Sequence, residues 1–223
     1  MDSNLSKRIP QVSCLLIPEP LMKERLDRQF LRRDNDRDTQ MRLVTASNAV
    51  EMSGIRDYFS IPGAVSTQYG EDYVELYQVY GEGNQWAPLW GTRLYRSGAV
   101  TRRSIVVSSP TDRKLWLSWL KDELRGTMIF AANVYEQYKV AVDQIRVLCV
   151  LRGAEELPLM LPGLLGMPVA RTPKTMEHFT ILPARERITM RSAELRDDPE
   201  GVADEFTRLL LLRYNDNPMS LGM

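Results

Sequence analysis

The sequence contains few of the residues that most often bind metals or carry out acid–base catalysis. It has one histidine, His178, and only two cysteines, Cys14 and Cys149, far apart along the chain. Zinc sites need clustered histidine, cysteine or carboxylate ligands, so the sequence argues against such a site. His178 is also the only imidazole available as a general base, and no Gly-x-Ser-x-Gly turn supplies a nucleophile for it. We therefore interpret His178 as a structural, hydrogen-bonded histidine.

Motifs that hold phosphates or dinucleotides are missing as well. No Gly-x-x-x-x-Gly-Lys-Ser/Thr loop occurs, and Gly81 and Gly83 lack the third glycine of a dinucleotide-binding turn. Tyr135 and Lys139 have the Tyr-x-x-x-Lys spacing of short-chain dehydrogenases, but no glycine-rich turn precedes them. A pair on a helix surface explains their spacing. The sequence predicts no catalytic residue, no cofactor and no metal, and we expect a protein that is not an enzyme.

The chain also lacks a net charge, because 29 basic residues balance 29 acidic ones. Without an overall field, nothing steers the whole molecule toward nucleic acid or an anionic membrane. The basic residues are unequal, since arginine outnumbers lysine 23 to 6. Arginine's planar fork pairs with carboxylates and phosphates and is enriched at protein interfaces. A GC-rich coding bias is the alternative explanation for this excess of arginine.

Long hydrophobic runs are absent. No segment reaches the roughly 18 apolar residues of a membrane-spanning helix, and the short run Leu15–Ile17 ends at Pro18, so it predicts no signal peptide. We expect a cytoplasmic protein, or one built into a particle that assembles in the cytoplasm. Cys14 and Cys149 both lie among apolar neighbours, which predicts buried free thiols, with a disulfide as the alternative.

Two consecutive helices are predicted in the middle of the chain. Ser109 and Pro110 have the residue types of a helix start, and Gly126 is a typical residue just after a helix end. The most regular apolar spacing follows over residues 127–151, and it predicts a central helix. One buried face of that helix would carry Phe130, Val134, Tyr138, Val142 and Ile145.

Weaker patterns complete the predicted fold. Apolar spacing favours helices over residues 20–33 and 198–214, while residues 40–52 fit a helix or a strand. Residues 73–80 are rich in strand-forming side chains, with a short helix as the alternative, and residues 91–107 are typical of a hairpin. These elements predict an α+β protein with three to four helices packed against a small, mostly antiparallel sheet. We expect one domain over residues 1–223, with a boundary near 153–175 as the alternative.

Two apolar or aromatic segments are candidate protein interfaces. Trp86 and Trp90 lie among glycine and proline residues, where they would anchor a contact or cover the core. Residues 157–170 carry no charge and include three prolines, so we expect an irregular loop that is barred from a central strand. Such a loop exposes more apolar surface than a monomer tolerates unless its own domain, a subunit or, as the weaker alternative, a membrane surface covers it. The predicted contact residues of this loop are Leu161, Leu164, Leu165 and Met167.

The function that these features favour is a non-enzymatic structural or adaptor subunit of a larger protein assembly. Virion, tail or baseplate components and secretion-machine subunits are examples of the class, in homo-oligomeric or mixed assemblies. The first alternative is a nucleic-acid-binding protein that uses the arginine clusters and the loop tryptophans. Its contact residues would be Arg32, Arg33, Arg102 and Arg103. The second alternative is a small enzyme for which the sequence identifies no site.

Overall fold

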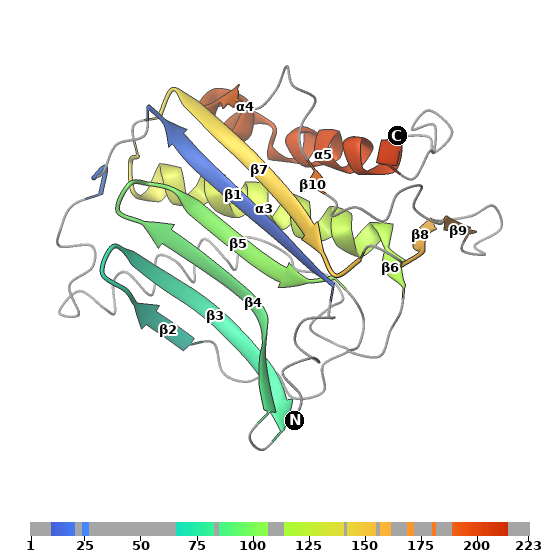
Figure 1. Cartoon of the computed structure of the whole chain (residues 1–223). Coiled ribbons are helices and arrows are strands. Elements are labelled where there is room, and N and C mark those ends of the chain that lie inside the picture. The colour runs from blue at the N-terminus through green and yellow to red at the C-terminus, as the bar shows by residue number, and fades with distance from the viewer. Residues whose placement is uncertain are drawn as a thin grey trace.

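A large antiparallel sheet dominates the molecule, with helices on one of its faces (Figure 1). The computed structural model describes residues 10–20, 24–26, 66–82, 85–106, 114–140, 142–154, 157–161, 169–171, 180–181 and 189–213. Among these residues, no helix has the length and apolar character needed to cross a membrane.

Eight strands belong to the large sheet, and seven of them follow the order β10-β7-β1-β5-β4-β3-β2, while β11 also pairs with β7. Every pairing in this sheet is antiparallel. The strands are β1 Gln11–Glu19, β2 Ser66–Tyr69, β3 Tyr73–Glu82, β4 Gln85–Tyr95, β5 Val100–Ile105, β7 Gln144–Arg152, β10 Thr180–Ile181 and β11 Thr189–Arg191.

The central strand β1 lies between β5 and β7, far from both in sequence. Its side chains alternate strictly between buried and half-buried positions, as expected for a strand with one face on a core. Strand β7 alternates in the same way, with Ile145, Val147 and Cys149 on the buried face. The two strands therefore present one apolar face to the helices and a second face away from them.

Helix α3, Leu117–Gln137, covers the buried face of the sheet, and helix α5, Pro199–Arg213, packs against α3. The short helix α4, Ser192–Asp197, joins β11 to α5. Phe130 and Val134 of α3 are completely buried, as the sequence predicts. Lys121 and Arg125 of α3 form ion pairs with Asp204 and Glu200 of α5 on the outer side of this helical layer.

A second sheet of three short strands lies beside the first. It has the order β6-β8-β9, with β6 Leu115–Trp116, β8 Leu159–Leu161 and β9 Val169–Arg171. Strand β8 pairs in parallel with β6 and antiparallel with β9. Its three residues are all buried, so part of the segment expected to be an irregular loop is the middle strand of a sheet. The prolines Pro162 and Pro168 lie outside the described residues.

The predicted fold class, three to four helices packed against a small sheet, is wrong. The structure has a large sheet of eight strands, and its described residues contain three helices, of which α4 has only six residues. Gly126 does not end a helix but lies buried in the middle of α3. The predicted helix over residues 127–151 ends at Gln137, because residues 144–152 form strand β7.

Other predictions of secondary structure stand. The strand at residues 73–80 is part of β3, the hairpin at residues 91–107 is formed by β4 and β5, and the last predicted helix is α5. Gly98 occupies the hairpin turn with a φ of 80°, a conformation that glycine adopts at little cost. Residues 40–52 and most of residues 20–33 lie outside the described residues, and the domain boundary near 153–175 stays a prediction.

Candidate functional site on the open face of the sheet

The face of the large sheet that turns away from α3 carries polar and aliphatic side chains in cross-strand rows. One row runs across five strands in register, from β7 to β3, and consists of Leu148, Leu15, Thr101, Arg93 and Glu75. The next row consists of Val150, Ser13, Arg103, Gly91 and Tyr77. Residues far apart in sequence thus meet on one surface, which we call the open face.

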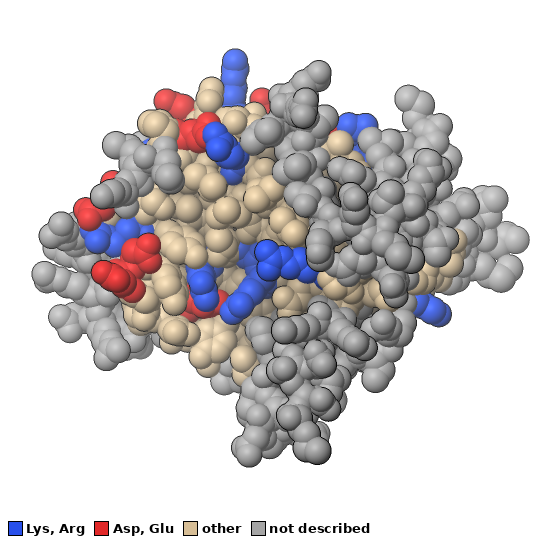
Figure 2. Space-filling model, viewed as in Figure 1, with Lys and Arg blue, Asp and Glu red and all other residues tan. Residues whose placement is uncertain are grey.

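A hollow of about 390 Å³ lies on this face. The half-buried aliphatic residues Leu15, Leu148 and Val150 form an apolar part, and Ser13 and Thr101 add hydroxyl groups. The charged residues of the lining that belong to the open face are Glu75, Arg93, Arg103 and Arg152. Basic side chains gather in the middle of this surface, with an acidic group next to them (Figure 2).

Glu75 is the anchor of the charged cluster. Its carboxylate accepts a hydrogen bond of 2.8 Å from Arg93 Nε and one of 3.1 Å from Arg103 Nη2. The Glu75 side chain is only 4% exposed, whereas those of Arg93 and Arg103 are 34% and 45% exposed. A nearly buried carboxylate thus holds two guanidinium groups that remain open to solvent.

Gly91 makes room for this carboxylate. A Cβ atom at position 91 would lie 2.8 Å from Glu75 Oε1 and 3.2 Å from Arg103 Nε. Both distances are tighter than ordinary contacts between such atoms. The absence of a side chain on the middle strand therefore allows Glu75 to reach both arginines from the neighbouring strand.

Two tyrosines hold Arg93 in place. Its guanidinium carbon lies 4.7 Å from the centre of the Tyr73 ring, in cation–π geometry, and Tyr73 in turn contacts Tyr95. Partial burial disfavours the charged form of Arg93, but hydrogen bonds to Glu75 and Tyr95 outweigh it and raise the pKa of Arg93 above its usual value. Arg93 is therefore a fixed, permanent cation at the edge of the hollow.

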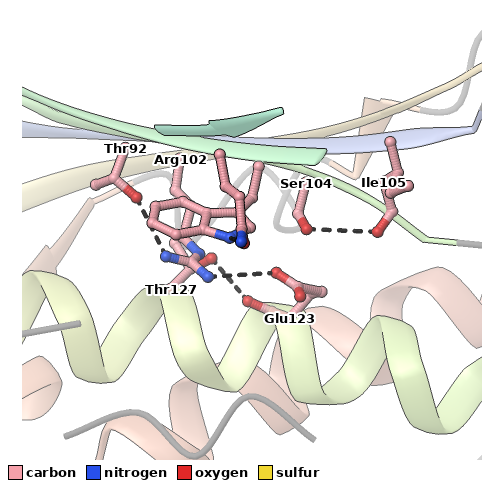
Figure 3. A network of polar contacts seen from close by, with 8 residues as sticks. Thr92, Arg102, Ser104, Ile105, Glu123 and Thr127 are labelled. Atoms are coloured by element: carbon pink, nitrogen blue, oxygen red, sulfur yellow. Dashed lines mark hydrogen bonds and ion pairs between the residues drawn. The ribbon is translucent and has the colours of Figure 1, made fainter. Parts of the chain in front are cut away.

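Arg102 and Arg103, which the sequence groups as one basic pair, point to opposite faces of β5. Arg102 faces α3 and has a side chain only 1% exposed. It donates a hydrogen bond of 3.1 Å to Thr92 and lies 3.7 Å from a carboxylate oxygen of Glu123 in α3. Figure 3 shows Thr92 and Arg102 reaching from the sheet toward the helix. Of this pair, only Arg103 lies on the open face.

Trp90 belongs to the same buried network. It is 3% exposed, its indole N–H donates to Gln78, and the Arg102 guanidinium lies 5.5 Å from its ring centre. Trp90 therefore lies in the core, which is one of the two positions that the sequence allowed for it. Trp86 lies in β4, but its side chain is outside the described part of the structure.

The remaining predicted site residues divide into two groups. Leu161 is 4% exposed in strand β8, within the core of this chain. The others lie outside the described residues, and their roles stay predictions; they are Arg32, Arg33, Leu164, Leu165, Met167 and His178. Within the described ranges, no three His, Cys, Asp or Glu side chains cluster closely enough to hold a metal ion.

Sequence reasoning missed Glu75, Arg93 and Arg152. The sequence did contain a signal for Glu75 and Arg93, because both lie in segments predicted as strands. Side chains alternate between the two faces of a strand, so a charged residue there indicates which face is turned toward solvent. The pairing of β3 with β4 could not be read from that pattern alone, since it depends on the register shift at Gln78 and Val79. Arg152 lies one residue beyond the helix predicted over residues 127–151, so no predicted strand included it, whereas the structure makes it the last residue of β7.

Comparisons of the chain with protein-family models, with curated proteins and with solved structures found no match. The function must therefore be inferred from the geometry of the open face.

Proposed function

We propose that this protein is a non-enzymatic binding subunit of a larger protein assembly, and that the hollow binds an acidic segment of a partner protein. The observation that carries this proposal is the charge of the hollow. Arg93, Arg103 and Arg152 line it together with a single carboxylate, Glu75, among the described lining residues of the open face. The site therefore has an excess of positive charge, although the whole chain is neutral.

The arginines are arranged to bind a further anion. A guanidinium group has five N–H donors in a fixed fork. Arg93 engages Glu75 through Nε, and Arg103 engages it through Nη2, so each retains donors beyond those that hold Glu75. Because Glu75 already restricts both side chains, less conformational entropy is lost when a second carboxylate binds. The two arginines thus form a preorganised binding site whose N–H groups can donate to a carboxylate.

The apolar part of the hollow favours a protein partner. Leu15, Leu148 and Val150 are half-buried on the open face, beside the arginines. Interfaces with nucleic acid are more polar and more positively charged than interfaces between proteins. A segment that alternates acidic and aliphatic side chains would complement both parts of the surface. This chemistry supports the adaptor role expected from the sequence.

Binding of a single-stranded nucleic acid is the second candidate, because three tyrosines share the open face. Tyr77 lies in the row of Arg103, and Tyr73 and Tyr95 pack beside Arg93. Aromatic rings next to arginine can stack on bases without regard to sequence. The two candidates differ in salt dependence, since contacts to several phosphates weaken steeply as salt rises.

Fluorescence anisotropy with three labelled probes tests the proposal. The probes are a peptide of alternating glutamate and leucine, the same peptide with lysine for glutamate, and a single-stranded oligonucleotide. We expect the glutamate peptide to bind and the lysine peptide to fail. Arg103→Ala and Arg152→Ala should each weaken binding about fivefold, because a partly exposed ion pair contributes about 1 kcal/mol.

Arg125→Ala is the matched control, since Arg125 is 48% exposed but lies in the helical layer and pairs with Glu200. Its peptide affinity should equal that of the unaltered protein. Equal binding of both peptides, or no effect of the two open-face substitutions, would contradict the proposal. Preferred binding of the oligonucleotide with a steep loss of affinity at higher salt would support the second candidate instead.

A further inference from the structure

The two cysteines of the chain meet on the buried face of the large sheet. Cys14 in β1 and Cys149 in β7 are directly opposite each other in the antiparallel register, and both are buried free thiols. The Cys149 thiol donates a hydrogen bond to Cys14 Sγ across 3.0 Å. Opposed residues of antiparallel strands have Cα atoms about 4.5–5.5 Å apart. That range lies within the separation of about 4.4–6.8 Å that disulfides span.

We propose that Cys14 and Cys149 are a redox modification site, at which hydrogen peroxide converts the two thiols to a cross-strand disulfide. In the first step, the Cys14 thiolate attacks one peroxide oxygen and the O–O bond breaks. The products are a sulfenic acid on Cys14 and, with the proton that Cys14 released, one water. In the second step, the Cys149 sulfur attacks the sulfenic sulfur. The S–O bond breaks, the S–S bond forms, and the departing hydroxide takes the Cys149 proton as a second water.

The environment of the two thiols assigns these roles. Burial, together with the interaction with Cys14, raises the pKa of Cys149 well above its usual value. The hydrogen bond sets the order of attack: Cys149 donates its proton toward Cys14, so Cys14 is the sulfur that attacks the oxidant and Cys149 is the resolving thiol. Because the reactive species is a thiolate and both sulfurs are buried, oxidation is slow and favours a small oxidant such as peroxide.

The disulfide would join the two strands that carry the apolar part of the hollow. Ser13 and Leu15 flank Cys14, and Leu148 and Val150 flank Cys149, all on the opposite face. A shift of one residue between these strands would turn their side chains to the wrong face. A covalent bond between Cys14 and Cys149 fixes the register and hence the shape of the open face. The disulfide would form whatever binds to the open face.

Peptide mapping of the folded, full-length chain tests the proposal. The folded protein is treated with hydrogen peroxide, the peroxide is removed, and the protein is then denatured, alkylated, digested with trypsin without reduction and analysed by mass spectrometry. We expect a linked pair of peptides, residues 9–23 and 147–152, two hydrogens lighter than the separate peptides. Dithiothreitol should restore both thiols. The proposal is overturned if both cysteines stay alkylatable, or if only sulfinic acids or disulfides between molecules form.

Two further measurements test whether the folded structure, and not chance oxidation, pairs Cys14 with Cys149. Treatment in concentrated urea should lower the fraction of oxidised cysteine that is found in the linked peptide, because the unfolded chain no longer holds the cysteines together; an equal fraction contradicts the proposal. Oxidised protein should also unfold at higher denaturant concentration than reduced protein, since the cross-link restricts the unfolded chain. The Cys14→Ala variant, with one thiol, should show neither the linked peptide nor this shift.

Discussion

Replacement of Arg102 by methionine is the sharpest test of how the sheet and α3 are joined. Arg102 is nearly inaccessible, donates to Thr92, and is the cation that faces Glu123, whose side chain is 5% exposed. Methionine keeps the length of the side chain but leaves the Glu123 carboxylate buried without this positive partner. Removing one member of a buried ion pair costs about 3–5 kcal/mol, which is a large part of the roughly 5–15 kcal/mol that stabilises a typical domain.

The double variant Arg102→Met with Glu123→Leu separates the ion pair from simple loss of packing. The 3.7 Å separation of the charged atoms is long for a hydrogen bond, so the pair gains little from direct bonding to offset its desolvation. Removing both charges should therefore restore most of the lost stability, with a residual cost of about 1–2 kcal/mol from the lost bond to Thr92 and the lost cation–π contact with Trp90.

Guanidinium chloride unfolding, followed by tryptophan fluorescence, measures Arg102→Met, Glu123→Leu and the double variant, because Trp90 lies against Arg102. A double variant destabilised by the sum of the two single variants would contradict this role of the ion pair. Unfolding of Arg102→Met at the original denaturant concentration would contradict it as well.

Three other predictions concern the open face, the buried acids and assembly. Gly91→Ala should displace the Glu75 carboxylate and weaken binding of the glutamate–leucine peptide, while far-ultraviolet circular dichroism stays unchanged; unaltered affinity would show that Glu75 does not position the arginines. Burial raises the pKa of Cys149 and Tyr135, so the folded state keeps protons that the unfolded state releases, and stability falls as pH rises above about 8.5. Denaturant midpoints measured from pH 7 to pH 11 should decline accordingly, and a flat profile contradicts this. Replacing Leu164 and Leu165 by Asp should leave unfolding cooperative but reduce the mass measured by light scattering; outright unfolding would place the segment in the core instead.

The sequence predicts those helices and hairpins whose stabilising contacts lie within a short stretch of chain. The hairpin of β4 and β5 follows from strand-forming residues on either side of Gly98, and α5 follows from apolar spacing after Pro199. Both elements depend on contacts or caps within a short stretch of chain, so their patterns are visible without the fold.

Strand β7 shows why the large sheet was missed. Residues 145–151 are all apolar except Arg146, so they satisfy a helical repeat and a strand repeat at once. The density of β-branched residues, Ile145, Val147 and Val150, favoured a strand. The decisive factor is the pairing with β1, more than a hundred residues earlier, which no local pattern reveals.

The site depends even more on long-range pairing. Arg103 was identified as a basic residue, but the alternation of β5 separates it from Arg102 by the thickness of the sheet. Glu75 acquires its role only because β3, β4 and β5 align it with Gly91 and both arginines. Composition indicated an arginine-rich interface, whereas the cross-strand register determines which arginines form it.

Protection of arginines from chemical modification tests the central claim most directly. The protein is treated with phenylglyoxal, which reacts with accessible guanidinium groups, with and without the glutamate–leucine peptide, and the modified residues are mapped by mass spectrometry. If the open face binds acidic partners, the peptide should protect Arg93, Arg103 and Arg152 and leave Arg125 and Arg196 reactive. Protection of Arg125 and Arg196 with the three open-face arginines unchanged would contradict the account.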